Sequence, residues 1–253
     1  MKELQYTTFT MSERPDLIEP GQQICDVAWP EFMMHDAVVN KYWWNLYKRF
    51  PHYQTVLLEK STREILAVGN CIPVKWAGQP EELPEKGIDW ILTEAFENGS
   101  PEGKGALSLF ALQIVVNPEY RGFALSAKAI QAMLAIGRKN GCRALYAPVR
   151  PNHKHLYPGT PIDDYIEWKN SDGRPFDPWM RVHDRLGAAI VRACHESMLI
   201  TGTIAEWEKW TNMQFPQSGS YIIPGALVPV QMDLEADIGT YIEPNVWMHH
   251  KII

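Results

Sequence analysis

The chain has 253 residues, of which 45% are apolar and 21% charged, so its composition supports a packed core and excludes global disorder. Its net charge of −6 argues against a surface built throughout for nucleic acid, because phosphate binding needs an excess of cations. The four cysteines form no CxxC pair, and we expect reduced, mostly buried thiols. The N-terminus lacks the apolar run of a signal peptide, and no stretch resembles a membrane span, so we expect a cytoplasmic protein without membrane partners.

The first third of the chain alternates helical and strand patterns. Apolar residues recur at helical spacing up to Phe50, where Pro51 ends the pattern. The polar run at 60–63 separates two strand-like segments and is typical of a hairpin turn. In order, the sequence predicts a strand at 6–10, a helix at 16–29 interrupted by Pro20-Gly21, a helix at 32–50, and strands at 53–59 and 64–74.

A βαβ-like unit is predicted in the middle of the chain. It follows a polar stretch at 78–105, which we interpret as an insertion with a short helical piece at 90–97. The unit consists of the longest apolar strand at 106–116, an amphipathic helix at 125–139 capped by Gly141, and a short apolar strand at 144–149. This order favours a mixed sheet.

A second insertion is expected at 152–178, which is rich in Pro, Gly, Asp and aromatic residues and has no helical or strand period. Long irregular loops inside compact domains are uncommon and often functional. After it the sequence predicts a helix at 179–188, a strand ending at Cys194, a helix at 204–211, and strand-like segments at 221–233 and 238–248.

The strongest local signal is the turn between the strand at 106–116 and the helix at 125–139. Gly122 and Ala124 would let an anion approach the backbone closely, and Arg121 adds a positive charge. The first N–H groups of a helix lack intrahelical partners and lie at the positive end of its dipole, so this turn could bind a pyrophosphate. An ordinary helix start explains the same residues, because short glycine motifs are weak signals.

The run from Pro118 to Ser126 resembles the acyl-donor loop of the GNAT acyltransferase superfamily, which reads Q/R-x-x-G-x-G/A after the fourth strand. The order of predicted elements is similar to that family over most of the chain, although Glu119 stands where the family usually has Gln or Arg. The resemblance implies an α/β GNAT-type fold: a mixed, mostly antiparallel central sheet flanked by helices, in a single domain over 1–253 with the two long loop insertions.

The resemblance also implies a donor substrate, acetyl-CoA or another acyl-CoA. In the family, the pantetheine amides pair with the splayed end of the fourth strand, and an Asn after the next strand often contacts the same arm. Asn152 matches that position, although it could instead hydrogen-bond its own turn. The residues thus assigned to the donor are Ile114, Val115, Val116, Arg121, Gly122, Phe123, Ala124, Leu125, Ser126 and Asn152.

A catalytic acid is implied at His183. GNAT enzymes commonly place a Tyr there, in a Y-x-x-x-G-F pattern, to protonate the leaving thiolate; the matching run here begins at His183. Histidine titrates near neutrality and can donate or accept a proton. The alternative is a histidine that packs on its helix and bonds a neighbour.

The acceptor is predicted to bind against the second insertion. Asp163, Asp164 and Tyr165 could form a pocket that attracts a cationic amine, with a solvated acidic loop as the alternative. His153 and His155 have no carboxylate or cysteine at ligand spacing, so no metal is expected. His249-His250 is predicted to be a surface pair.

The resemblance implies an N-acyltransferase that moves an acyl group from acyl-CoA to the amine of a small-molecule acceptor by direct attack in a ternary complex. One alternative is the same fold with an acyl-carrier-protein or aminoacyl-tRNA donor, and another is a non-catalytic acyl-CoA-binding module. Basic residues that could meet CoA phosphates, a carrier protein or tRNA are Lys128, Arg138, Lys139, Arg143, Arg150 and Lys154. Their scattered charge is also typical of a solvated helix face. The sequence leaves the acceptor, the acyl chain, the general base and the oligomeric state open.

Overall fold

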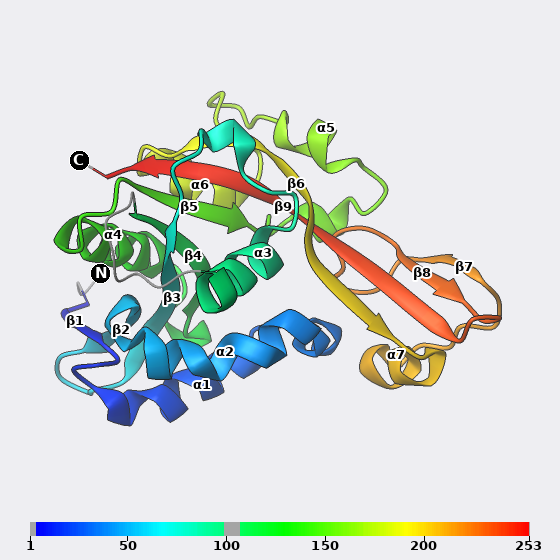
Figure 1. Cartoon of the computed structure of the whole chain (residues 1–253), viewed down its shortest axis with the longest axis horizontal. Coiled ribbons are helices and arrows are strands. Elements are labelled where there is room, and N and C mark those ends of the chain that lie inside the picture. The colour runs from blue at the N-terminus through cyan, green and yellow to red at the C-terminus, as the bar shows by residue number, and fades with distance from the viewer. Residues whose placement is uncertain (1–3, 99–106, 253) are drawn as a thin grey trace.

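The structure, a computed structural model, describes residues 4–98 and 107–252. Within them a single sheet of nine strands runs in the order β1-β2-β3-β4-β5-β9-β8-β7, and β6 pairs with β9 (Figure 1). The strands are β1 (Tyr6–Thr10), β2 (Gln54–Glu59), β3 (Ile65–Lys75), β4 (Leu107–Val116), β5 (Ala144–Val149), β6 (Ala189–Gly202), β7 (Gly219–Tyr221), β8 (Val230–Asp233) and β9 (Ile238–Lys251).

Only β4 and β5 pair in parallel; the other strand pairs are antiparallel. The sheet is therefore mixed and mostly antiparallel, as predicted. Its longest contact joins β9 to β6, and β9 also pairs with β5 and β8. A single strand thus links the two ends of the sheet.

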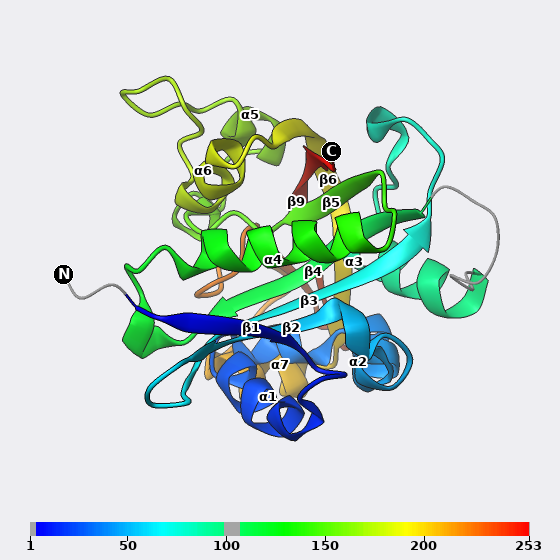
Figure 2. The ribbon, with the colours of Figure 1, turned by 90° about the vertical axis from the view of Figure 1, so that its left-hand side faces the viewer.

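Helices cover both faces of the sheet. Figure 2 shows α4 lying across one face of β2, β3 and β4, with α1 and α2 against the opposite face. In the described part of the chain, no helix is long and apolar enough to cross a membrane. The helices are α1 (Ile18–Asp26), α2 (Ala37–Arg49), α3 (Gly87–Thr93), α4 (Leu125–Lys139), α5 (Ile162–Ile166), α6 (Pro178–Arg185) and α7 (Ile204–Thr211).

The helix predicted at 16–29 is shorter, and Pro20-Gly21 does not interrupt it. Pro20 lies in the first turn of α1, where backbone N–H groups have no intrahelical partner, so its missing N–H is tolerated. Gly21 is buried, and a Cβ at this position would lie only 3.3 Å from the Val68 side chain. The site therefore favours glycine for close packing against β3.

The helix predicted at 32–50 is broken at Asp36. A short 3-10 helix covers Glu31–His35, and Asp36 then has extended backbone angles while its carboxylate accepts from the Val39 N–H at 2.8 Å. This side chain is an N-cap, which starts α2 afresh. Helical spacing alone did not reveal the cap.

The second insertion is more ordered than predicted. Within 152–178 the structure has the short helix α5 and a bridge between Lys169 and Pro175. Aromatic rings hold this segment together in place of a longer regular element: Tyr157, Tyr165, Trp168 and Phe176 pack with centroids 4.9 to 6.1 Å apart.

Three C-terminal predictions also change. The strand predicted to end at Cys194 continues as β6 to Gly202 through a register shift between Cys194 and Met198. The segment predicted at 221–233 contains two strands, β7 and β8. The strand predicted at 238–248 extends as β9 to Lys251.

In the first insertion, the helical piece predicted at 90–97 corresponds to α3 followed by a π-helical turn at Glu94–Asn98. Residues 99–105 of that insertion lie outside the described residues, as does Ala106, the predicted first residue of the long strand. All four cysteines are free and buried, as predicted.

Candidate active site

A cavity of about 970 Å³ opens between the diverging ends of β4 and β5. Register pairs between these strands are limited to Leu109 with Leu145 and Phe110 with Tyr146, although β4 continues to Val116. The other edge of β4 stays paired with β3 along this stretch. Its free edge can therefore hydrogen-bond an extended ligand that lies along it.

The turn after β4 lines the same cavity. Gly122 has φ +90°, and Ala124, at φ +54°, is the N-cap of α4 without a side-chain cap bond. The Lys128 N–H bonds the Ala124 carbonyl at 3.3 Å, so the amides before Lys128 lie outside the helical ladder. These amides at the positive end of a 15-residue helix form a site suited to a phosphate.

Most residues predicted to hold the donor come together at this cavity. Phe123 does not line it and is 42% exposed. Glu119 is also exposed and outside the lining, so its carboxylate does not face the cavity. The predicted donor residues that do line it are Ile114, Val115, Val116, Arg121, Gly122, Ala124, Leu125, Ser126 and Asn152.

His183, on α6, also lines the cavity and is almost completely buried. Its Nδ1 lies 2.9 Å from Nε2 of His250 on β9, and the edge of the Trp179 ring packs against it. Burial, reinforced by His250, holds the pKa of His183 well below its usual value, so His183 is neutral at pH 7. Its Nε2 has no hydrogen-bond partner in the described part of the chain.

The predicted surface pair at His249-His250 is wrong for His250. This residue is 2% exposed, because β9 extends past both histidines and pairs them with β5. Two of the basic residues that could meet phosphates are engaged within the protein. Lys154 is buried, with its ammonium donating to the carbonyls of Tyr157 and Leu227, and Arg150 is held by Glu243.

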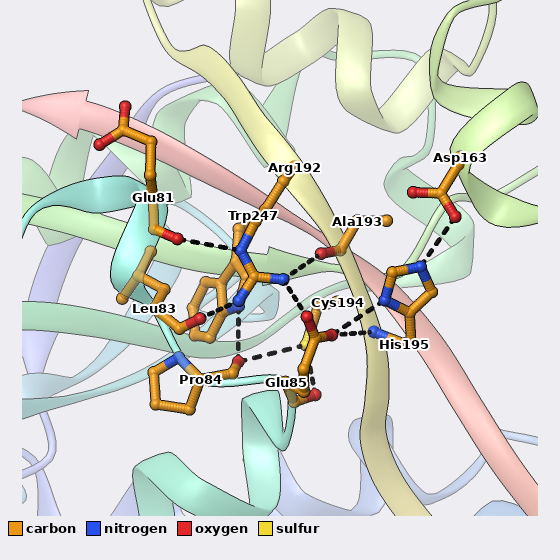
Figure 3. A network of polar contacts seen from close by, with 10 residues as sticks. All are labelled: Glu81, Leu83, Pro84, Glu85, Asp163, Arg192, Ala193, Cys194, His195 and Trp247. Carbon is orange, nitrogen blue, oxygen red and sulfur yellow. Dashed lines mark hydrogen bonds and ion pairs between the residues drawn. The ribbon is translucent and has the colours of Figure 1, made fainter.

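The structure does not bring Asp163, Asp164 and Tyr165 to the cavity lining. Tyr165 is 1% exposed, and its hydroxyl donates to Asp177 at 3.0 Å. Asp163 instead accepts from His195 Nε2 at 2.8 Å (Figure 3). From the second insertion, the cavity receives Asn152, His153 and His155, close to the end of β5.

The sequence analysis missed an ion pair in the cavity wall. Arg150, at the end of β5, donates from Nε to Glu243 of β9 at 2.8 Å. Asn245 of β9 and Trp29, after α1, also line the cavity. The available signal was a Glu and an Asn inside the otherwise apolar run of β9, where a polar side chain needs a buried partner.

A splayed parallel strand pair beside a left-handed turn and a helix N-terminus is typical of one class of acyltransferases. The chain belongs to this class, the GNAT family: the family model described as "Acetyltransferase (GNAT) family" matches residues 22–157. The arginine N-acetyltransferase avaD of Aspergillus versicolor is 32% identical to this chain, over 98% of this chain and 94% of that protein.

Two solved structures share the fold. The loading GNATL domain of CurA from Lyngbya majuscula has a TM-score of 0.60 at 18% identity, covering 98% of both chains. The GphF GNAT-like decarboxylase in complex with isobutyryl-CoA has a TM-score of 0.55 at 16% identity, covering 98% of this chain and all of that one. Together, the family model and the A. versicolor relative show that this chain is an acyltransferase of the GNAT family.

Proposed function

We propose that this enzyme transfers an acetyl or related acyl group from acyl-CoA to the amine of a small-molecule acceptor, within a ternary complex. The observation that carries the proposal is one continuous cavity that joins the free β4 edge and the α4 turn to a separate polar wall on β9. Its volume of about 970 Å³ lies at the upper end of the range for small-molecule sites.

The donor would lie along the free edge of β4, with its pyrophosphate at the turn of Gly122 and Ala124. Backbone N–H groups suit this task because they hold an anion without a flexible side chain. Arg121 adds a mobile positive charge at the rim. The thioester would then lie between the diverging strands.

Direct attack is favoured over a covalent acyl-enzyme. Cys25 is the cysteine in the cavity lining, and burial raises the pKa of its thiol to about 12. The reactive form of cysteine is the thiolate, which is negligible at pH 7 for such a group. The acceptor amine would therefore attack the thioester carbon itself, and neutral His183 would take the proton that the amine loses and pass it to the departing thiolate.

An amino acid such as arginine is the acceptor that we propose to test first, because the A. versicolor relative is an arginine N-acetyltransferase. Purified enzyme would be incubated with acetyl-CoA and L-arginine while free thiol is followed, and the product identified by mass spectrometry. We expect equal amounts of CoA and N-acetylarginine.

The same assay separates the alternatives. Transfer from an acyl-carrier protein or an aminoacyl-tRNA, with none from acetyl-CoA or longer acyl-CoAs, would overturn the proposed donor. Thermal stabilisation by acyl-CoA without product from any amine would identify a binding module; a ligand at 100 times its dissociation constant adds about 2.7 kcal/mol to the free energy of unfolding.

A further inference from the structure

The polar wall of the cavity opposite the α4 turn is centred on Arg150. Its side chain is 18% exposed, whereas that of Glu243 is 1% exposed. Both line the cavity, together with Asn245 and Trp29. A buried ion pair in a ligand cavity is weak evidence for stability, because desolvating the two charges offsets most of their attraction. A role in recognising a ligand explains its position better.

The protein fixes the orientation of the Arg150 guanidinium from three sides. Nε donates to Glu243 Oε1 at 2.8 Å, and Nη2 donates to the Gly225 carbonyl at 2.6 Å. The carbon of the guanidinium lies 5.9 Å from the centre of the Trp29 ring, which is itself anchored by a bond to Gln113 at 2.9 Å. A group held in this way has lost its rotamer freedom before a ligand arrives.

Arg150 nevertheless keeps hydrogen-bonding capacity. A guanidinium has five N–H groups. Glu243, Gly225 and Tyr241 are the groups that interact with it in the described part of the chain, and they use at most three. At least two N–H groups therefore remain for a ligand in the cavity.

Glu243 is held by neutral donors as well as by Arg150. Its Oε1 also accepts from Asn245, and its Oε2 accepts from the Tyr241 hydroxyl at 2.9 Å. These bonds fix the carboxylate, so Arg150 does not have to satisfy it alone. The remaining N–H groups of the guanidinium can then donate to a second anion, and its planar fork matches a carboxylate.

We propose that Arg150 binds the carboxylate of an amino-acid acceptor and thereby selects amino acids over simple amines. This inference rests on the proposed N-acyltransfer and specifies the acceptor class for it. The α-carboxylate would lie against Arg150 and Trp29, which directs the adjacent amine toward the gap between β4 and β5. Arg150 would contact substrate, so it acts as a specificity residue.

Substrate analogues test the proposal on the unaltered enzyme. L-arginine, argininamide and agmatine share the guanidinium and the primary amine. On the carbon that bears this amine, arginine carries a carboxylate, argininamide an amide and agmatine a hydrogen. The amine of argininamide is less basic than that of arginine and the amine of agmatine is more basic, so the pair brackets the effect of amine protonation. We expect kcat/KM to be about 10- to 100-fold lower for both analogues, the range for a charge-assisted hydrogen-bonded pair.

The two hypotheses fail differently. If none of the three amines yields an N-acyl product, the proposed N-acyltransfer to such acceptors is wrong. If all three react with similar kcat/KM, N-acyltransfer stands and carboxylate recognition by Arg150 is wrong.

Variants assign the effect to Arg150. Arg150→Lys keeps the charge opposite Glu243, so the fold is expected to survive, but it loses the fork. The preference for arginine over agmatine should then fall to within about threefold, with the donor KM unchanged. Arg121→Lys is the matched control at the donor end, and it should alter the donor KM while keeping the preference. A preference retained by Arg150→Lys, or a donor KM that rises instead, would overturn the proposal.

Discussion

Gly122 and Ala124 show how two backbone angles shape the donor turn. Both have positive φ, and Gly122 has open space where a side chain would begin. Ala124 tolerates the left-handed conformation at a cost of roughly 1 kcal/mol. The conformation turns the chain so that α4 starts with its amides facing the cavity.

Replacing Gly122 by Asp should abolish stabilisation by CoA, because a negative charge would lie where the pyrophosphate binds. Gly122→Asn is the matched control, since it has the same shape and the same backbone strain without the charge. Thermal melting with and without CoA, compared at low and high salt, measures the effect. Similar CoA stabilisation in both variants would mean that the turn is only a helix start.

His183 is suited to proton transfer as a neutral imidazole. Its Nδ1 and Nε2 of His250 share one hydrogen bond, so only one of the two nitrogens carries the proton. Burial lowers the pKa of His250 to about 4, and that of His183 is lowered too. We therefore expect both rings to be neutral in the folded protein at pH 7.

We predict that His183→Phe lowers kcat by roughly 10²-fold, the usual scale for losing a positioned acid or base. The dissociation constant of the donor should stay unchanged. His249→Phe is the control, because His249 stacks on Tyr146 and is outside the cavity lining. Steady-state kinetics together with CoA titration separate the two quantities. Wild-type turnover in His183→Phe would reduce His183 to a packing role.

At the scale of elements, a network around β6 joins the two insertions. His195 of β6 interacts with Glu85, from the first insertion, and Asp163, from α5, at 3.0 and 2.8 Å (Figure 3). Arg192 of β6 donates to Glu85 and to carbonyls of the same loop. The carboxylate of Asp163 raises the pKa of His195, with Glu85 adding to the effect.

This network predicts a structural role for Asp163. Because folding raises the pKa of His195, its contacts with the two carboxylates stabilise the fold fully below the ordinary pKa of about 6.5. This stabilisation is lost as the pH rises through the pKa of His195 in the folded protein. Asp163→Asn should therefore lower Tm at pH 6 and have little effect at pH 9. The pairs are exposed, so the shift will be small.

Asp164→Asn, one residue away, is the control and should leave Tm unchanged at both pH values. Neither variant is expected to change the KM of the acceptor. A raised acceptor KM in Asp163→Asn would instead restore the acceptor role that the sequence suggested for this loop.

Elements with a strong local signal could be predicted from the sequence. The bounds of β1, β5, α4 and α7 match, because their apolar patterns are continuous and their ends carry clear stop signals. The helix break at Asp36 has a local cause, an N-cap bond to Val39, which helical spacing alone does not reveal. The extension of β6 could not be predicted, since it depends on an irregularity in strand pairing.

The same contrast applies to the candidate site. Most residues that we propose for the donor lie within 114–126, so a local motif indicates them. Arg150 and Glu243 are 93 residues apart, and only strand pairing brings them together. The acceptor was predicted at a loop with two adjacent acids, which lie outside the cavity lining, whereas we propose that Arg150 binds the acceptor.

At the scale of the whole molecule, two interacting carboxyls, one buried on Asp36 and one half-buried on Asp89, join α2, α3 and β6. Asp36 caps α2, and Asp89 of α3 accepts from the Leu199 N–H at 3.2 Å. The two carboxyls interact, and each has one oxygen without a partner among the described residues. Burial and the nearby charge of Asp36 raise the pKa of Asp89 to about 8, so the folded protein holds a proton there.

This proton makes global stability depend on pH. The unfolded chain releases it above about pH 4, whereas the folded chain keeps it to about pH 8, so the free energy of unfolding should fall over this interval. Asp89→Asn should flatten that decline and be more stable relative to wild type at pH 8 than at pH 5. Urea unfolding at several pH values measures it, with the exposed Glu235→Gln as a charge control. An unchanged slope in Asp89→Asn would show that the pair does not hold the proton.

The position of β9 also has a consequence for biosynthesis. It is translated after every other described strand, yet it lies between β5 and β6 and provides Glu243 and Asn245. On the ribosome, the donor turn and α4 can assemble on β1 to β5 while the edge of β5 stays open. Open apolar strand edges invite association with other chains. The turn before α4 would thus form before β9 adds Glu243 and Asn245 to the cavity wall.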